Sequence, residues 1–482
     1  MFKLSLNYTW WLIVGLSILL FSDLKITSIE PYQELKLILN GFLAPDWFTK
    51  IDILPAIFNT LAFALQGVAF GSLAGFLLSL FLHHWQVRVF CAAIRAVHEL
   101  FWALLFLQIL GLSPLTGVLA IAIPYAGIFA KVYGELMEQE GTKTHRGLEY
   151  SGNLNLKFFT HVVTAWPSIK TYTGYRIECA LRSSIVLGFI GLPTIGFYLE
   201  SAFSSGNYAE SAALLYLLIG LVGTLRFWLK GYLIPFYLLA CFIYLPPVAD
   251  FSANVLWQFL SHDLVPVPLR SDQTWGVWLY SLFKQIGNGA ILTLGLAYLA
   301  MLVSGLLALL QFPLISKHFF YRPARFFGNF LLIIQRSIPE LVLAYIFLLM
   351  LGPSWIPAIL ALALHNGAIV AHLLGRYSFT LTLRTDAVDG LMRYFYEILP
   401  RVQTQFLAFL FYRWEVIQRE TVILGVLGIH TLGFYVDSAF EELRFDRALV
   451  LIIVTALLNI VLDIFTTRMR NRLQMPTIPE QL

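Results

Sequence analysis

One segment of the chain occurs twice. Residues 175–203 and 412–440 align without a gap at an offset of 237, and 14 of the 29 aligned positions are identical. The shared positions keep Glu and Arg in step, and a merely apolar composition does not produce that agreement. We therefore interpret the chain as a duplication, with a first repeat in residues 1–229 and a second repeat in residues 230–482.

Composition places both repeats in a membrane. Of the 482 residues, 59% are hydrophobic and only 12% are charged, and the mean hydropathy is +0.75. A soluble globular protein needs more polar surface than this. Apolar runs long enough to cross a hydrocarbon core of about 30 Å predict an all-α polytopic membrane protein with about twelve transmembrane helices, six in each repeat.

Charged residues are distributed unevenly between the predicted loops. Loops rich in Lys and Arg alternate with loops that lean acidic. By the positive-inside rule, the basic loops and both termini are expected in the cytoplasm. The net charge of +4 is the sum of this asymmetry, so it does not indicate nucleic acid binding.

Three glycines recur at matching places in the two copies of the repeated segment, namely Gly188, Gly191 and Gly196, and then Gly425, Gly428 and Gly433. Glycine in a membrane helix permits the close approach of a neighbouring helix or a break in the helix itself. We expect the fifth helix of each repeat to be interrupted near mid-membrane and to line a translocation path. Simple close packing of helices would give the same sequence signal.

Two charge pairs also recur. Arg95 with Glu99 is repeated as Arg336 with Glu340, and Glu178 with Arg182 is repeated as Glu415 with Arg419. The members of each pair are four residues apart. In Glu178 with Arg182 and Glu415 with Arg419 the acid comes first, the orientation that lets one helix pair its own charges near a membrane interface. Two interpretations stay open. The charges could form helix contacts that are remade as the repeats move, or they could mark interfacial helix ends that satisfy their own charges.

Motifs for nucleotide binding and catalysis are missing. No Gly-Lys dipeptide occurs, so the chain has no P-loop and cannot bind ATP in the Walker manner. The patterns His-Glu-x-x-His and Gly-x-Ser-x-Gly do not occur either. The pair His83-His84 has no further ligands at suitable spacing, so no metal site, cofactor or catalytic residue is expected in the chain.

Several motifs resemble the phosphonate-type permease subunits of bacterial ABC importers. In the second repeat these motifs are Arg336-Ser337-Ile338-Pro339-Glu340-Leu341, Ala363-Leu364-His365-Asn366-Gly367, Leu399-Pro400 and Tyr412-Arg413-Trp414-Glu415. The resemblance covers nearly the whole chain, as two family units fused in tandem. It implies the type I importer permease fold and a transport subunit, not an enzyme. It also implies a place in the bacterial inner membrane, and alternating access of a phosphonate, phosphate or similar oxyanion.

The same resemblance implies partners. Two copies of a cytoplasmic P-loop ATPase would bind ATP and dock on a coupling helix in each repeat, and an external binding protein would deliver the solute. The coupling residues would be Glu149, Gly152 and Pro167 in the first repeat, and Arg384 and Pro400 in the second. Both copies depart from the family's Glu-Ala-Ala, Gly and Leu-Pro pattern. The second copy lacks the acid and the glycine, and the first spaces its Gly and Pro fifteen residues apart.

Two other functions stay open. An ion-coupled secondary transporter with parallel repeats would use Glu99, Glu178, Glu340 and Glu415 and would need no ATPase. A membrane scaffold would recruit partners through the polar segments 135–174 and 376–405 without transporting a solute.

Overall fold

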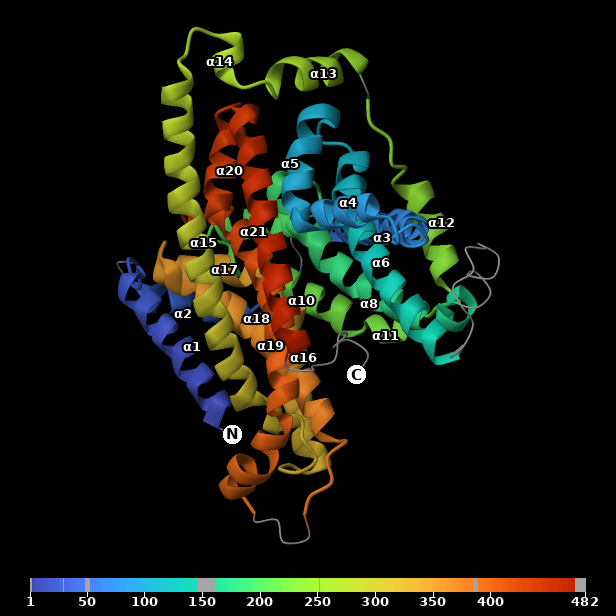
Figure 1. Ribbon diagram of the computed structural model, residues 1–482, viewed down its shortest axis with the longest axis vertical. Helices are drawn as coiled ribbons and strands as arrows, with labels where there is room; N and C mark the ends of the chain where they lie inside the picture. Colours follow the sequence, from blue (N-terminus) through green and yellow to red (C-terminus); the bar gives the residue numbers. More distant parts are fainter. Residues whose placement is uncertain are drawn as a thin grey trace. The chain divides into compact units, whose positions relative to one another are not determined.

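The computed structural model (Figure 1) describes most of the chain, namely residues 2–28, 30–47, 53–144, 161–250, 252–384 and 389–472. Every secondary-structure element in these residues is a helix, so the predicted all-α fold is confirmed. The chain divides into two compact units. The first unit comprises Gly41–Leu264, and the second comprises Met1–Asn40 together with Val265–Leu482.

Helices of the first unit follow one another with short connections. In chain order they are α3 (Ile53–Ser79), α4 (Trp85–Ala96), α5 (Glu99–Leu110), α6 (Pro114–Thr144), α8 (Val163–Val186), η2 (Leu187–Ile190), α9 (Ile195–Ser204), α10 (Tyr208–Gly223), α11 (Leu225–Trp228), α12 (Ile234–Tyr244), α13 (Ala253–Gln258) and η3 (Phe259–Asp263). The helix α2 (Pro31–Leu43) crosses the boundary between the units.

The second unit begins with the first helix of the chain. Its elements are α1 (Phe2–Phe21), α14 (Val267–Arg270), α15 (Trp275–Gln311), η4 (Phe312–Ile315), α16 (Arg322–Ser337), α17 (Glu340–Leu351), α18 (Trp355–Ser378), η5 (Arg393–Ile398), α19 (Leu399–Ile423), η6 (Leu424–Leu427), α20 (Leu432–Glu441) and α21 (Phe445–Arg472).

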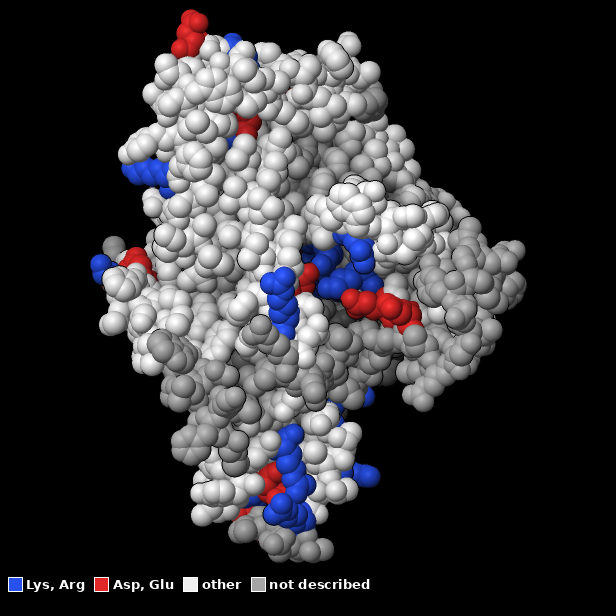
Figure 2. All heavy atoms as spheres, viewed as in Figure 1, with Lys and Arg blue, Asp and Glu red and all other residues white. Residues whose placement is uncertain are grey.

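Helix length and apolarity indicate which elements cross a membrane. Among the described residues, five helices are long and apolar enough, and the number rises to nine if each bent pair is one span. Charged atoms occupy only small patches of the face shown in Figure 2. The membrane fold class is confirmed, but the count of about twelve spans is not. Bends and breaks divide apolar runs that look continuous in the sequence.

Each unit has an elbow, which we define as a bend of nearly a right angle between consecutive helices. In the first unit α4 and α5 meet at 89°, and in the second unit α16 and α17 meet at 87°. The second elbow contains Pro339. The residue before it, Ile338, is extended with φ −81° and ψ 125°, as expected for a residue that precedes proline.

Each unit also has a broken helix. In the first unit α8 and η2 end at Ile190, and α9 resumes at Ile195 in a direction that differs by 50°. In the second unit α19 and η6 end at Leu427, and α20 resumes at Leu432 with a bend of 44°. The interruption lies where the repeated glycines predict it.

The first helix of the chain packs in the second unit. The Trp11 ring of α1 stacks on Tyr298 of α15 with 5.7 Å between ring centroids, and the Tyr298 hydroxyl donates to the Trp11 carbonyl oxygen at 2.7 Å. Conversely, α12 packs in the first unit, where Gln66 Nε2 of α3 donates to the carbonyl oxygens of Cys241 and Leu245. The units therefore do not coincide with the predicted repeats, whose boundary stays a prediction about the sequence.

Close helix packing in the first unit depends on glycine. Gly67, Gly71 and Gly75 are four residues apart, so they lie on one face of α3. A Cβ atom on Gly75 would lie 2.5 Å from the Cβ atom of Phe129 in α6. Glycine therefore lets α3 and α6 approach closely, which is how membrane helices gain van der Waals contact.

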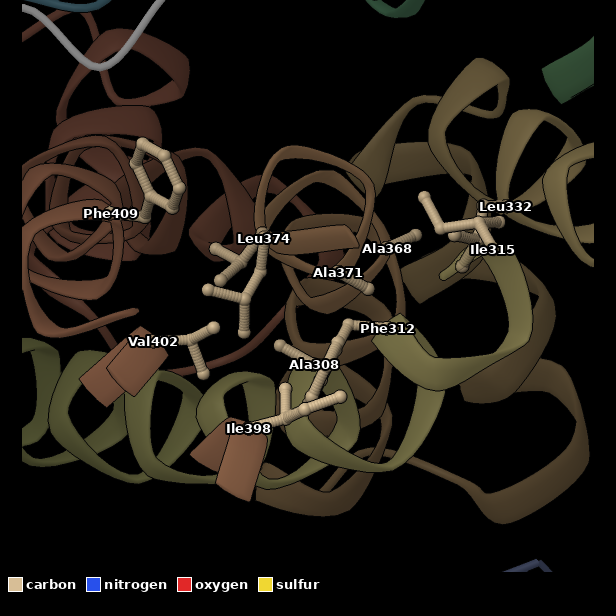
Figure 3. Close-up of a cluster of buried hydrophobic side chains, with 11 residues drawn as sticks. Ala308, Phe312, Ile315, Leu332, Ala368, Ala371, Leu374, Ile398, Val402 and Phe409 are labelled. Carbon is tan, nitrogen blue, oxygen red and sulfur yellow. The ribbon is translucent and has the colours of Figure 1, made fainter. Parts of the chain in front are cut away.

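The core of the second unit joins α15, η4, α18 and α19. Figure 3 shows Ala308 and Phe312 beside Leu374 and Val402, and all four side chains are fully buried. Leu381, which follows the end of α18, packs against the same cluster. The segment between α18 and η5 is thus anchored to the core of this unit.

A threonine from a neighbouring helix caps the resumed helix in each unit. Thr60 Oγ1 of α3 accepts a hydrogen bond from the Ile195 backbone N–H at 3.0 Å, and Thr293 Oγ1 of α15 accepts one from the Leu432 backbone N–H at 2.9 Å. A helix that starts inside a membrane has N–H groups that water cannot reach. The two threonines supply the missing acceptor, so the breaks are stable parts of the fold.

Replacing Thr293 by Val removes the acceptor and keeps the shape of the side chain. We expect Thr293→Val to lower the free energy of unfolding by about 0.5–1.5 kcal/mol, the usual range for hydrogen bonds between membrane helices. Thermal unfolding in detergent measures this loss. Thr455→Val is the matched control, because the buried Thr455 hydroxyl donates to the Leu451 carbonyl oxygen of its own helix. Equal losses in the two variants would contradict the capping role.

Candidate functional site

The six predicted glycines all lie at the two breaks, with Gly188, Gly191 and Gly196 in the first unit and Gly425, Gly428 and Gly433 in the second. Gly191 and Gly428 have φ angles of +96° and +81°, in the left-handed region that favours glycine. A Cβ atom on Gly425 would overlap the backbone nitrogen of Phe434. At each break the backbone on the two sides packs so closely that a side chain is excluded. A gating role for these glycines stays a prediction.

A buried polar cluster joins α17, α18 and α19 of the second unit. Glu340, the first residue of α17, has a carboxyl oxygen 2.7 Å from His365 Nε2. His365 Nδ1 donates to the Ile338 carbonyl oxygen at the elbow, at 2.9 Å. Asn366 Nδ2 donates to Glu420 Oε2 of α19, also at 2.9 Å. Glu340, His365, Asn366 and Glu420, which we call the second-unit cluster, are each at most 9% exposed.

The hydrogen-bond partners of His365 determine where its protons lie. A carbonyl oxygen can only accept, so Nδ1 carries a hydrogen atom. The contact of 2.7 Å between Nε2 and the Glu340 carboxyl group then needs one proton, carried by the imidazole or by the carboxyl group. In both arrangements the pair is neutral overall. This neutrality makes a buried carboxyl group tolerable among apolar helices.

The first unit has a related cluster around Glu99, the first residue of α5. The Glu99 carboxylate lies 3.1 Å from His98 Nε2 and accepts a hydrogen bond from Ser183 Oγ of α8 at 3.4 Å. Ser183 Oγ also lies 3.5 Å from Tyr125 Oη of α6. His98 Nδ1 accepts from the Leu100 backbone N–H, so Nε2 carries the hydrogen atom that faces Glu99.

The two clusters use corresponding positions with different side chains. At the offset of 237, Glu420 occupies the position that corresponds to Ser183. At the offset of 241, Asn366 occupies the position that corresponds to Tyr125. The imidazole comes from a different position in each unit. Because the side chains at these positions differ between the repeats, the search for residues identical in both repeats did not find Ser183, Tyr125 and Glu420. An acidic residue in an apolar helix is the signal that could have identified Glu420.

The other repeated charges lie on the elbows and the broken helices. Arg95 and Arg336 stand near the ends of α4 and α16, Glu178 and Arg182 stand on α8, and Glu415 and Arg419 stand on α19. Arg182 Nη2 donates to Cys179 Sγ at 3.5 Å. The elbows place Arg95 and Glu99, and likewise Arg336 and Glu340, on different helices. The pairing of Glu178 with Arg182 and of Glu415 with Arg419 within one helix stays a prediction.

Contacts to a single carboxylate hold the second predicted coupling segment. Glu397 Oε1 accepts from the Arg384 backbone N–H at 3.2 Å and lies 2.6 Å from Arg401 Nη2. Arg401 Nη1 also donates to the Thr382 carbonyl oxygen at 2.7 Å. Pro400 stands in the first turn of α19. The segment before η5 is thereby tied to the start of the broken helix.

The first predicted coupling segment is described only in part. Glu149 and Gly152 lie outside the described residues. Pro167 lies near the start of α8 and is exposed, as Pro400 is near the start of α19. In each unit the proline therefore stands at one end of the broken helix, and the glycines lie at the other end.

A histidine connects the second segment to the loop after η4. His318 Nε2 donates to the Ser378 carbonyl oxygen at 2.9 Å, and Arg393 Nη1 donates to the His318 carbonyl oxygen at 2.8 Å. Burial lowers the pKa of His318, and the positive charges of Lys317 and Arg393 add to this effect, although the hydrogen bond to Ser378 opposes it. His318 is therefore neutral near pH 7.

Comparison with known proteins finds relatives among permeases. The phosphate-import permease protein PhnE of Mycolicibacterium smegmatis is 26% identical over 438 residues, which cover 80% of this chain and 77% of that protein. The phosphite transport system permease protein PtxC of Stutzerimonas stutzeri is 29% identical over 137 residues, which cover 28% of this chain and half of that protein. A chain assigned to a cryptic phosphonate transport system of Escherichia coli, the permease protein PhnE2, is 29% identical over 112 residues.

No family model matches the chain. The crystal structure of an amino acid ABC transporter with histidines is 18% identical, covers 42% of this chain and 99% of that one, and has a TM-score of 0.35. A TM-score this low supports no argument about the chain. The three relatives are permease proteins of transport systems and not enzymes, and they confirm the predicted resemblance to permease subunits.

Removing Glu340 leaves His365 buried without its acidic partner. We expect Glu340→Ala to lower the free energy of unfolding by about 3–5 kcal/mol, the usual cost of breaking a buried ion pair from one side. Adding His365→Phe should recover part of this loss. A double-mutant cycle, measured by unfolding in detergent, gives the coupling energy of the pair.

The matched control is the pair Glu442 and Arg444, which is 3.9 Å apart and partly exposed. Its coupling energy should stay below about 1 kcal/mol. A coupling energy for Glu340 and His365 no larger than that of the control would contradict the account of the second-unit cluster.

Proposed function

We propose that this chain, a relative of permease proteins from phosphate, phosphite and phosphonate transport systems, is the transmembrane permease of an ATP-driven ABC importer. The observation that carries the proposal is the match to a phosphate-import permease along 80% of the chain. The 438 aligned residues exceed the length of either unit, so the likeness includes both units. The chain would lie in a bacterial inner membrane, with both termini in the cytoplasm.

Two tandem repeats, residues 1–229 and 230–482, would together do the work of two separate permease subunits. Corresponding geometry supports this part of the proposal. The elbows measure 89° and 87°, and the broken helices bend by 50° and 44°. A threonine hydroxyl caps the resumed helix in both units. Parallel repeats of this kind have a pseudo-two-fold axis along the membrane normal, where a path can form.

Alternating access would act through the broken helices. The change of helix direction by 44° at the break, with Gly428 at a φ of +81°, supports a joint at this place. The clusters around Glu99 and Glu340 tie the elbows to neighbouring helices and would serve as fixed points. Motion of α9 and α20, which resume after the breaks, relative to these points would open the path to one side of the membrane at a time.

The solute would be a tetrahedral oxyanion such as phosphate, phosphite or a phosphonate. The names of the relatives support this class of solute. His365 and Asn366 are engaged with Glu340, Glu420 and the Ile338 carbonyl oxygen, so their role is structural. Selection of the solute would belong to a separate external binding protein.

Energy would come from two copies of a P-loop ATPase, which bind ATP as partner subunits, so the chain itself needs no cofactor. One copy would dock on the segment that contains Arg384 and Pro400. The other would dock near Glu149, Gly152 and Pro167. The contacts of Glu397 with Arg384 and Arg401 support the first of these surfaces, because they hold it in one shape.

Purification of the tagged chain in mild detergent, followed by mass spectrometry, tests the proposal. A P-loop ATPase should be recovered at about two copies for each chain. The variant Glu397→Ala releases Arg384 and Arg401, so it should reduce ATPase recovery several-fold while the yield of the chain stays the same. Glu442→Ala removes an exposed acid far along the sequence from this segment and should have no effect.

Recovery of the chain without an ATPase, while a known importer stays intact under the same conditions, would contradict the proposal. It would favour an ion-coupled transporter instead. Equal ATPase recovery from Glu397→Ala and the unchanged chain would leave the importer role standing and would place the docking surface elsewhere.

A further inference from the structure

Four cationic side chains gather in the second unit where the long helices α15 and α18 end. Lys317 follows η4, Arg322 and Arg325 lie in the first turn of α16, and Arg376 lies in the last turn of α18. The Phe379 ring joins them, since Arg325 lies 5.4 Å and Lys317 lies 6.0 Å from its centroid. We call Lys317, Arg322, Arg325 and Arg376 the basic patch.

Among the described residues, the basic patch has no ion-paired counter-charge. In the described part of the chain, no carboxylate forms an ion pair with any of its four members. Lys317 Nζ donates to the Phe379 carbonyl oxygen at 2.7 Å. Arg325 Nε is enclosed by protein and has no hydrogen-bond acceptor among the described residues. Cations held this close together repel one another, so an external anion would stabilise them.

An exposed apolar face adjoins the basic patch. On α16, Phe326, Phe327 and Phe330 are 68%, 70% and 53% exposed. The opposite face of α16 carries Gly328, where a Cβ atom would lie 2.6 Å from the Leu314 carbonyl oxygen. A helix with Phe on one side and Arg in its first turn suits the boundary between headgroups and acyl chains.

Contacts at the two ends of α16 show its direction. Arg325, near its start, lies 5.4 Å from the Phe379 ring beyond the end of α18, and the carbonyl oxygen of Ile338, just after its end, accepts from His365 in the middle of α18, so α16 runs alongside the span α18. The apolar helix α17 meets α16 at 87°, so the two helices cannot both run along the membrane normal. Two candidate spans, Trp275–Ile315 and Trp355–Ser378, end beside the basic patch. We therefore expect the patch at headgroup level and the Phe face of α16 against the acyl chains.

We propose that the basic patch binds the phosphate-bearing headgroup of an anionic phospholipid, whose acyl chains lie along Phe326, Phe327 and Phe330. Clusters of four or more Lys and Arg beside membrane helices recognise such lipids through charge. The exposed Arg322 guanidinium would donate to a phosphate oxygen, and Lys317, Arg325 and Arg376 would add positive charge around it. The inference depends on the membrane fold and not on an ATPase or on the transported solute.

The first unit offers a natural comparison. Its helix α4 also exposes apolar side chains, with Trp85 at 63% and Phe90 at 54%. The position that corresponds to Arg325 by the offset of 241 is His84, and Arg88 is the exposed cation of this helix. The lipid site is therefore expected in the second unit alone.

Native mass spectrometry of the full chain, titrated with phosphatidylglycerol and with phosphatidylcholine, tests the proposal. The unchanged chain should retain phosphatidylglycerol in preference to phosphatidylcholine, and added salt should weaken the retention. Each neutralised cation should weaken it about fivefold. We would use Arg322→Gln, whose side chain is exposed, and the combination of Arg322→Gln with Arg325→Gln. Arg88→Gln is the matched control and should change nothing.

Arg325→Lys keeps the charge and should keep most of the binding, which separates a headgroup site from a packing role. Inorganic phosphate at millimolar concentration should not displace the lipid, because the acyl chains contribute to binding. Retention that is unchanged in Arg322→Gln, or equally reduced in Arg88→Gln, would overturn the proposal. Displacement of the lipid by phosphate alone would overturn it in favour of a free-anion site.

Discussion

Each interruption of a helix inside a membrane exposes N–H and C=O groups that water cannot reach, and the fold depends on how these groups are satisfied. Side chains of neighbouring helices satisfy them. Thr60 and Thr293 cap the resumed helices, His365 donates to the Ile338 carbonyl oxygen at the elbow, and Gln66 donates to two carbonyl oxygens at the end of α12. The elbows and breaks are therefore fixed by contacts between helices and are not local irregularities.

These fixed contacts suggest how a signal would cross the second unit. The helix α19 extends from Leu399 to Ile423, about 37 Å at the usual rise per residue. Pro400 and the ion pair of Glu397 with Arg401 lie at one end, and Gly425 follows the other. The second-unit cluster holds α19 near its glycines through Glu420. A displacement of the docking end would thus reach the break through one continuous helix.

Sequence composition and single residues predicted the fold class and the breaks of the helices. Features that depend on packing between distant segments could not be predicted in this way. Composition predicted an all-α membrane protein, and the repeated glycines predicted the breaks because no other residue fits those contacts. Pro339 marks the second elbow, but the first elbow has His98 at that place and no comparable signal. The packing of α1 in the second unit, and the meeting of Glu340, His365 and Glu420, depend on contacts between distant segments. The count of about twelve spans is not confirmed, because bends and breaks divide the apolar runs.

The account of two linked units driven by a separate ATPase is tested most directly by transport in sealed vesicles that contain the purified complex. Uptake of phosphate or a phosphonate, delivered by the binding protein, should require ATP on the ATPase side and should persist when pH and sodium gradients are dissipated. Uptake by the chain alone, driven by an ion gradient and indifferent to ATP, would contradict the account.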